Sequence, residues 1–192
     1  MRPVPLHPAM TAETPLALLM ARVVGGDTAA FNQLARALQG PGLRLADRTL
    51  NDRAGAEDVV QVALTRMWTM ATRYDPARGS VEGWFRRIVV NLCLDRRRSL
   101  KLVAPLAEAD DVPSRDPDPF ETAAANDTRT RLDKAMAHLA PRQRAALALF
   151  HGDGLTMAEI ALALETTPKA VEGLLGRARM ELRTLMGVET PS

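Results

Sequence analysis

The chain has a single cysteine, Cys93, among its 192 residues. One cysteine excludes a disulfide framework and any cysteine-rich zinc site. The three histidines, His7, His138 and His151, are scattered, and no pair has the spacing of two metal ligands on one helix. A glycine-rich phosphate loop is also missing. We therefore expect no metal, no cofactor, no small-molecule substrate and no enzymatic activity.

Aromatic residues and long apolar runs are scarce as well. Aromatic residues make up 4% of the chain, and no apolar run approaches the roughly 20 residues that a membrane-spanning helix needs. The N-terminal residues are rich in proline and lack the apolar stretch of a signal peptide. These absences predict a cytoplasmic protein with no direct membrane insertion. Abundant alanine, leucine, methionine and arginine, with few β-branched residues, predict an all-α fold rather than a sandwich or barrel.

The net charge of +2 hides an uneven distribution. Residues 18–102 carry 14 Lys and Arg against 8 Asp and Glu, whereas residues 103–130 carry 2 against 7. A basic half of this kind predicts a polyanionic partner. The acidic middle is either a solvated segment or a mimic of such a polyanion.

The acidic segment also divides the chain into two parts. Residues 103–119 contain four prolines and five acidic residues. Proline removes a backbone donor and disfavours helix at the preceding residue, so we expect an acidic, proline-rich linker here. Two small helical domains are then expected at residues 14–102 and 120–187, with a flexible tail at 1–13 and a short tail at 188–192.

Three apolar patterns with helical spacing follow one another in the first domain. The first is capped by Asp27 and is predicted to end at Gly40-Pro41-Gly42. The second runs from about residue 54 to 73, and the third from about 81 to 100, with a turn-rich loop between them. The second helix has a polar stripe that is nearly uncharged, and it includes Asp58, Gln61 and Thr65.

The third helix combines an apolar face with a polar one. We interpret Trp84 and Phe85 as core residues and Cys93 as a small buried apolar residue. The opposite face carries Arg87, Asn91, Asp95 and Arg98. The helix ends in the basic run Arg96-Arg97-Arg98, at a helix C-terminus where cations are favoured.

The second domain contains the pattern of a helix-turn-helix. Thr156 and Glu159 form a capping box that opens a short helix, and Pro168 suits the first position of a longer one. A short helix, a brief turn and a longer helix match this DNA-binding motif, although any helical hairpin can imitate it.

Several segments together resemble the group IV, or extracytoplasmic function (ECF), sigma factors of the sigma-70 family. Ala56–Gln61 with Trp68 is similar to the core-binding helix of conserved region 2. Trp84–Ile88, followed by Asn91 and Asp95–Arg98, is similar to the helix that melts the promoter and reads the −10 element. Leu139–Arg144, Met157–Ala161 and Arg177–Arg179 resemble region 4. The resemblance extends over roughly residues 14–187, in the family's order.

The resemblance implies a protein that binds RNA polymerase core and directs it to promoters, with a cognate anti-sigma factor as inhibitor. Region 2 would bind the clamp coiled coil of the core and the opened −10 strand, and region 4 would bind the flap and the −35 duplex. For the core we expect Asp58, Gln61 and Thr65. A single strand needs a cationic track and surfaces for unstacked bases, and for the −10 DNA we expect Tyr74, Arg87, Asn91, Arg96, Arg97 and Arg98. For the −35 DNA we expect Lys169, Glu172, Gly173, Gly176, Arg177 and Arg179.

Other interpretations stay open at this point. Tyr74 could pack within its loop, Asp95 could order the neighbouring arginines, and Glu172 could be a solvated helix residue rather than a base reader. The presumed recognition helix also departs from the family, where a basic residue is common at the position of Glu172. As a whole, the chain could be a sigma mimic that sequesters an anti-sigma factor, or a one-component helix-turn-helix regulator.

Overall fold

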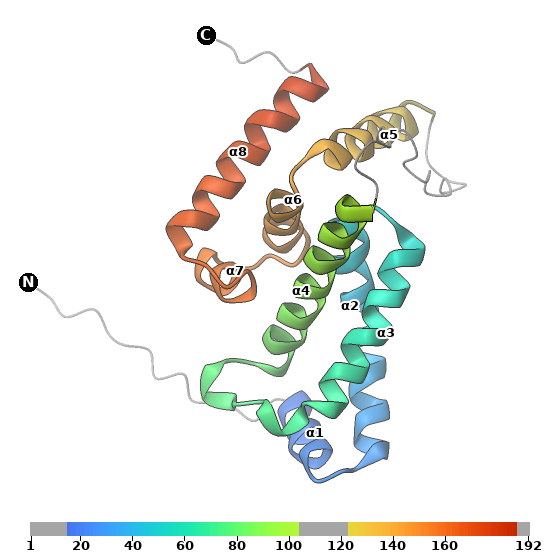
Figure 1. The fold of residues 1–192 in the computed structure, drawn as a ribbon, viewed down its shortest axis with the longest axis vertical. Helices are drawn as coiled ribbons and strands as arrows, with labels where there is room; N and C mark the ends of the chain where they lie inside the picture. The colour runs from blue at the N-terminus through green and yellow to red at the C-terminus, as the bar shows by residue number, and fades with distance from the viewer. Residues whose placement is uncertain (1–14, 104–122, 188–192) are drawn as a thin grey trace, which may run out of the picture.

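A computed structural model of the chain describes residues 15–103 and 123–187. These residues form eight α-helices, with short helical turns between α3 and α4 and between α6 and α7, and no β-strand occurs among them. The all-α prediction is confirmed. Figure 1 shows an N-terminal bundle, α1–α4, and a C-terminal bundle, α5–α8. The predicted tails at 1–13 and 188–192 lie outside the described residues, as does the predicted linker at 103–119 apart from Val103, which ends α4.

The long helices of the N-terminal bundle begin close to the predicted positions. Aspartates open two of them: Asp27 accepts a hydrogen bond from the Ala30 amide at 3.0 Å, and Asp52 accepts one from the Gly55 amide at 2.9 Å. Such caps satisfy amides that have no partner inside the helix. The four helices are α1 (Pro15–Val24), α2 (Thr28–Leu50), α3 (Arg53–Thr69) and α4 (Val81–Val103), with 3₁₀ turns at Ala71–Arg73 and Pro76–Arg78.

One expectation for this bundle is wrong. Gly40-Pro41-Gly42 does not end the first long helix, because α2 continues through Pro41 to Leu50. An internal proline costs a helix about 3 kcal/mol, and packing after the proline offsets that cost: Leu45, Ala46 and Leu50 are buried. Gly42 lies against Phe85, whose Cε1 atom would be 2.8 Å from a Cβ at this position. The glycine therefore serves close helix packing rather than helix termination.

The C-terminal bundle has the predicted helix-turn-helix. Thr156 and Glu159 form the capping box, with the Thr156 amide donating to the Glu159 carboxylate at 2.9 Å, and Thr167 caps the last helix ahead of Pro168. Ala161 is buried, as close contact between the two helices requires. The elements are α5 (Ala123–His138), α6 (Pro141–Leu147), a π-helical turn (Ala148–Gly152), α7 (Met157–Ala163) and α8 (Pro168–Met186).

The two bundles pack against each other, with α6 and α7 lying along α2 and α4 (Figure 1). A single apolar cluster extends across the contact, from Leu45 and Val90 to Leu149 and Ile160. The two halves therefore share one hydrophobic core.

A buried arginine strengthens this contact between the bundles. Arg144 of α6 is 1% exposed, and it donates to the carbonyl of Leu50 at the end of α2, at 3.3 Å. The same guanidinium donates to Ala137 and Leu139, at 3.2 and 3.3 Å. Burial lowers the pKa of Arg144 to about 10, and the arginine remains charged at neutral pH. It thus joins carbonyls at the C-terminal ends of two helices, where cations are favoured.

Candidate functional site

A cavity of about 480 Å³ lies between the two bundles. The N-terminal bundle contributes five arginines, which we call the arginine wall: Arg66, Arg73, Arg78, Arg86 and Arg87. The C-terminal bundle faces them with the carboxylates Glu159 and Glu165 and with Leu155 and Leu162. The two sides of the cavity therefore carry opposite charge.

An aromatic pair forms part of the cavity lining beside the arginine wall. The rings of Tyr74 and Trp84 lie 5.6 Å apart, and both are half-buried. The Tyr74 hydroxyl donates to the Gly79 carbonyl at 3.1 Å, which holds the loop from residue 74 to 80 closed. Burial is the main reason that the pKa of Tyr74 lies above its usual value. Tyr74 is thus packed within its loop here, whereas Phe85 is fully in the core as predicted.

Two polar contacts cross the boundary between the bundles next to this cavity. The Arg86 Nε atom donates to Asp153 Oδ2 at 3.0 Å, in a partly buried ion pair. The Asn91 Nδ2 atom donates to Glu165 Oε1 at 3.4 Å. The pKa of Glu159 is lowered, mainly by the hydrogen bonds from Thr156 and further by the charge of Arg86. The α4 face that we predicted to bind DNA is therefore partly covered by acidic groups of the same chain.

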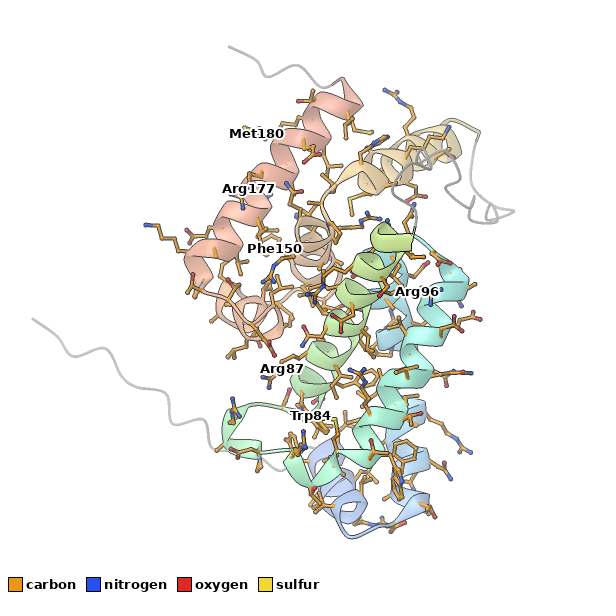
Figure 2. All side chains as sticks on the ribbon, in the orientation of Figure 1. Trp84, Arg87, Arg96, Phe150, Arg177 and Met180 are labelled. Carbon is orange, nitrogen blue, oxygen red and sulfur yellow. The ribbon has the colours of Figure 1, made fainter. Side chains whose placement is uncertain are left out.

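The basic run at the end of α4 is divided among three different environments. Arg96 lies between two carboxylates of α3 and its cap, at 3.8 Å from Asp52 and 3.4 Å from Asp58. Arg97 donates to the Leu50 carbonyl, and burial lowers its pKa. Arg98 is exposed and pairs with Asp95, so Asp95 does order one of these arginines. Figure 2 shows Arg96 on the side of α4 that faces α3, away from Arg87. The predicted −10 residues of α4 are thus split between two of its faces, and Tyr74 lies in the loop before this helix.

The predicted core-binding residues do lie together on the exposed face of α3. Asp58, Gln61 and Thr65 are all exposed. The Thr65 hydroxyl donates to the Gln61 carbonyl at 2.9 Å, which turns it onto the helix backbone. Asp58 is paired with Arg96 at 3.4 Å, and the two opposite charges partly offset each other. The result is a surface of low charge.

The predicted −35 residues lie along the outer helix α8. Lys169, Glu172, Gly176 and Arg177 are exposed, and Gly173 is partly covered by the Arg177 side chain, whose Nη1 would be 3.4 Å from a Cβ there. Arg179 differs, since its guanidinium carbon lies 5.3 Å from the centre of the Phe150 ring. Figure 2 shows Arg177 and Met180 on α8, the helix on the outer edge of the C-terminal bundle.

Sequence reasoning missed several residues of these surfaces. Four of the five wall arginines were not predicted: Arg66, Arg73, Arg78 and Arg86 come from α3, both short turns and α4. Helical spacing alone places Arg66 and Arg73 on one side of the second helix, but only the fold brings that side to α4. Val62 was also missed. It is 44% exposed beside Gln61 and supplies an apolar centre for the α3 surface.

The remaining predictions concern cysteine, metals and membranes. Cys93 is buried as expected, and burial raises the pKa of its thiol to about 12. Within residues 15–103 and 123–187 no group of three or more potential metal-ligating side chains occurs. None of the helices in that same part of the chain is both long and apolar enough for a bilayer.

Comparison with family models matches both halves of the chain in the expected order. The model for Sigma-70 region 2 matches residues 34–103, and the model for Sigma-70, region 4 matches residues 129–182. Arg144, the whole of α7 and most of α8 fall within the second match.

Curated relatives carry the same description. The ECF RNA polymerase sigma factor SigM of Mycobacterium tuberculosis is 35% identical over 173 residues, covering 88% of this chain and 83% of SigM. The ECF RNA polymerase sigma factor SigE of Mycolicibacterium smegmatis is 33% identical over 164 residues. That match covers 82% of this chain but 63% of SigE, so the chain spans less than two thirds of that relative.

Solved structures agree on the fold. The sigma factor CnrH, solved with the cytosolic domain of CnrY, has a TM-score of 0.64 at 28% identity, covering 90% of this chain and 97% of CnrH. The sigma factor RpoE of Bartonella quintana, solved with the anti-sigma factor NepR, has a TM-score of 0.63 at 21% identity and covers 78% of this chain and 92% of its own. Two family models match the chain in the family's order, and SigM is 35% identical to it over most of its length. This chain therefore belongs to the ECF RNA polymerase sigma factors of the sigma-70 family.

Proposed function

We propose that this chain acts in the cytoplasm as an alternative sigma factor, which binds RNA polymerase core and directs initiation at a −35/−10 promoter pair. The proposal is based on one observation: each of the two sigma regions carries an exposed surface with cationic side chains that could contact DNA. One surface is the arginine wall beside α4, and the other is the exposed side of α8. The function needs no catalytic group of the chain's own, because the core carries out the chemistry.

The exposed α3 surface is our proposed contact with the clamp coiled coil of the core. Its centre, Val62 with Gln61 and Thr65, is apolar or uncharged, and the centres of protein interfaces are depleted of charge. Region 4 would sit on the flap. Substituting Gln61→Arg and Thr65→Arg should weaken association with core by at least about tenfold in a fluorescence titration. Asn32→Arg with Gln33→Arg, on the exposed side of α2, adds the same charge and should leave the affinity unchanged.

Promoter DNA is the second partner, and the two DNA surfaces have different tasks. Arg87 and Asn91, with the rest of the arginine wall, are proposed to hold the opened −10 strand. On α8, Lys169 and Arg177 are proposed to contact phosphates or bases of the −35 duplex, with Glu172 between them. Gly173 and Gly176 have no side chains, so the backbone of α8 can approach DNA closely at these positions.

A cognate anti-sigma factor is the third proposed partner. The related CnrH was solved with the cytosolic domain of CnrY, which supports control of this kind. We expect such an inhibitor to touch both bundles, and hydrogen exchange should then show protection on each of them. Protection confined to one bundle would exclude an inhibitor that wraps around both.

Run-off transcription tests the function directly. Purified core, this chain and fragments of the source genome should together give promoter-specific transcripts, and core alone should not. A sigma mimic would bind an anti-sigma factor but yield no transcript. A one-component regulator would bind DNA without core and alter transcription by another sigma factor. Absence of any core-dependent transcript would therefore remove the proposed function.

A further inference from the structure

Another cavity between the bundles, of about 570 Å³, shares no lining residue with the one at the arginine wall. The N-terminal bundle lines it with the end of α2 and the start of α3, and the C-terminal bundle with α5, the π-helical turn and α8. Sites for small molecules are concave and enclose roughly 300–1,000 Å³. The cavity therefore has the volume of a small-molecule site.

Part of the cavity lining is apolar. Large aliphatic side chains of α5, α6 and α8 contribute to it: Leu132, Met136, Leu147 and Leu182. Leu132 is 43% exposed, and Met136 and Leu182 are half-buried. Transfer of apolar surface out of water is favourable, so these side chains favour a ligand with an apolar body.

Three arginines also line the cavity, and they differ in their partners. Arg53 pairs with Glu57 at 3.1 Å, and the guanidinium carbon of Arg179 lies 5.3 Å from the centre of the Phe150 ring. The exposed Arg48 guanidinium has no hydrogen bond or ion pair within residues 15–103 and 123–187. Arg48 thus presents to the cavity a positive charge with which no carboxylate of the described residues pairs.

The position of Arg48 depends on Gly152. A Cβ at Gly152 would meet the Arg48 Nη1 atom and would lie 3.1 Å from Cζ, so a larger residue there would displace the guanidinium. Asn51 lines the same cavity, and its Nδ2 atom is buried with no hydrogen-bond partner in the described part of the chain. A buried donor without an acceptor is destabilising. A ligand acceptor reached by a small rotation of this amide would remove that cost.

The remaining titratable side chains of the lining are those of His151 and two aspartates, Asp47 and Asp133. Each aspartate already takes part in an interaction of its own. Three arginines against two carboxylates leave the lining with an excess of positive charge, which favours an anion over a cation.

We propose that this cavity binds a small amphipathic organic anion, with its acidic group beside Arg48 and Asn51 and its apolar body against Leu132, Met136 and Leu182. Both bundles contribute to the site, so a ligand that fills it stabilises their packing by mass action. The protein would then respond directly to a metabolite of this class, at a site separate from the proposed DNA surfaces.

Methionine methyl signals in nuclear magnetic resonance locate the ligand, because each cavity has a methionine of its own. Met136 lines this cavity, and Met70 lines the one at the arginine wall. In the full-length chain with isotope-labelled methionine methyl groups, Met136→Leu and Met70→Leu assign the two signals. Decanoate should shift the Met136 signal saturably, with half-saturation below about 1 mM, and should leave the Met70 signal in place.

A series of probes tests the charge requirement without any substitution. Decyl phosphate should shift the same Met136 signal, and the tighter of the two anions identifies the preferred acidic group. Decyltrimethylammonium has the same alkyl length and the opposite charge. It should bind at least about tenfold more weakly than decanoate, because it cannot accept a hydrogen bond from a charged donor.

Two pairs of variants test the role of Arg48. Arg48→Gln removes its charge, and Gly152→Ala displaces the guanidinium without a change of charge. Each should weaken decanoate binding about five- to tenfold. Arg44→Gln and Gly40→Ala are the matched controls on α2: Arg44 is exposed, and a Cβ at Gly40 would make an ordinary contact with its Nη1 atom at 3.5 Å. Neither control residue lines the cavity, so both controls should bind decanoate like the wild type.

Urea unfolding identifies any variant that does not fold, in which case the probe series and the other variant decide. The proposal is overturned if decanoate leaves the Met136 signal unchanged, or if decyltrimethylammonium binds as tightly as decanoate. It is also overturned if a folded Arg48→Gln or Gly152→Ala variant keeps the wild-type affinity, or if the matched controls lose affinity to the same extent.

Discussion

Helices α4 and α8 are the two proposed DNA-contacting helices of this protein, and they differ in what covers them. Along α8, Lys169, Glu172 and Arg177 are open to solvent. Along α4, Asn91 is bonded to Glu165, and the neighbouring Arg86 to Asp153. Both covering carboxylates belong to the C-terminal bundle that also carries α8.

This difference shows that two helices with similar cationic and polar side chains can differ in whether those side chains are exposed or bonded within the protein. The exposed side chains of α8 are open to a DNA duplex as the chain stands. Binding of a strand at Asn91 would first require its hydrogen bond with Glu165 to break. A sigma factor arranged in this way would bind an intact −35 duplex before it binds an opened −10 strand.

Removing Arg144 should disturb the arrangement most. Arg144→Met leaves the carbonyls of Leu50, Ala137 and Leu139 without this donor, at a cost of about 3 kcal/mol in the free energy of unfolding. Urea unfolding measures that cost. Arg142→Met is the control, because the exposed Arg142 donates to a single carbonyl, that of Leu164, and its loss should cost about 1 kcal/mol or less. Equal effects of the two substitutions would contradict the role given to Arg144.

Two arginines of α4, Arg97 and Arg87, are expected to have different roles: the first stabilises the fold and the second binds DNA. Arg97→Met should lower the free energy of unfolding by about 2 kcal/mol, because Arg97 caps the Leu50 carbonyl from a largely buried position. Arg87→Met should leave stability within about 0.5 kcal/mol and weaken −10 strand binding instead. Unfolding and oligonucleotide titrations on both variants decide this, and a stability loss from Arg87→Met alone would reverse the assignment.

Arg177 allows a test of the uncovered helix. If it contacts a phosphate, Arg177→Ala should weaken binding of all −35 duplexes alike and reduce the slope of log affinity against log salt by about 1. Titrations at several salt concentrations give that slope. Met180→Ala, on the same exposed side of the bundle, should leave the slope unchanged. A loss restricted to one base pair would show instead that Arg177 reads a base.

Glu172 should have the smallest effect, limited to sequence preference. Its carboxylate repels phosphate, but it can accept from a cytosine amino group. Glu172→Gln should therefore raise non-specific affinity and relax preference at one base pair by about 1 kcal/mol. Competition over a randomised −35 hexamer at fixed salt measures this. Identical selection by both proteins would mean that Glu172 is only a solvated helix residue.

Much of the fold was predictable because local chemistry decides where these helices begin. Asp27, the Thr156–Glu159 box and Pro168 all act within a few residues of their own position, and each was identified correctly. Pro41 was misread for the complementary reason. Its local preference is to end a helix, but Gly42 packs against Phe85, a residue more than 40 positions away, and that contact is invisible in local sequence.

The candidate sites were predictable in part, for a similar reason. Helical spacing placed Gln61 and Thr65 on one face without knowledge of the fold. It gave no means to see that Arg96 pairs with Asp58, or that Asp153 reaches Arg86 across 67 positions of sequence. Ion pairs between distant segments depend on how the bundles pack against each other. No repeat or residue spacing in the sequence predicts that packing.

The most direct test of the difference between α4 and α8 is a paired titration of one protein with two DNAs. The wild type and Asp153→Lys are each titrated with a −35 duplex and with a −10 single strand at the same salt concentration. The account predicts that the substitution raises affinity for the strand about three- to tenfold more than affinity for the duplex. An equal change for both DNAs would mean that the substitution merely adds a cation, and that the α4 surface is as open as that of α8.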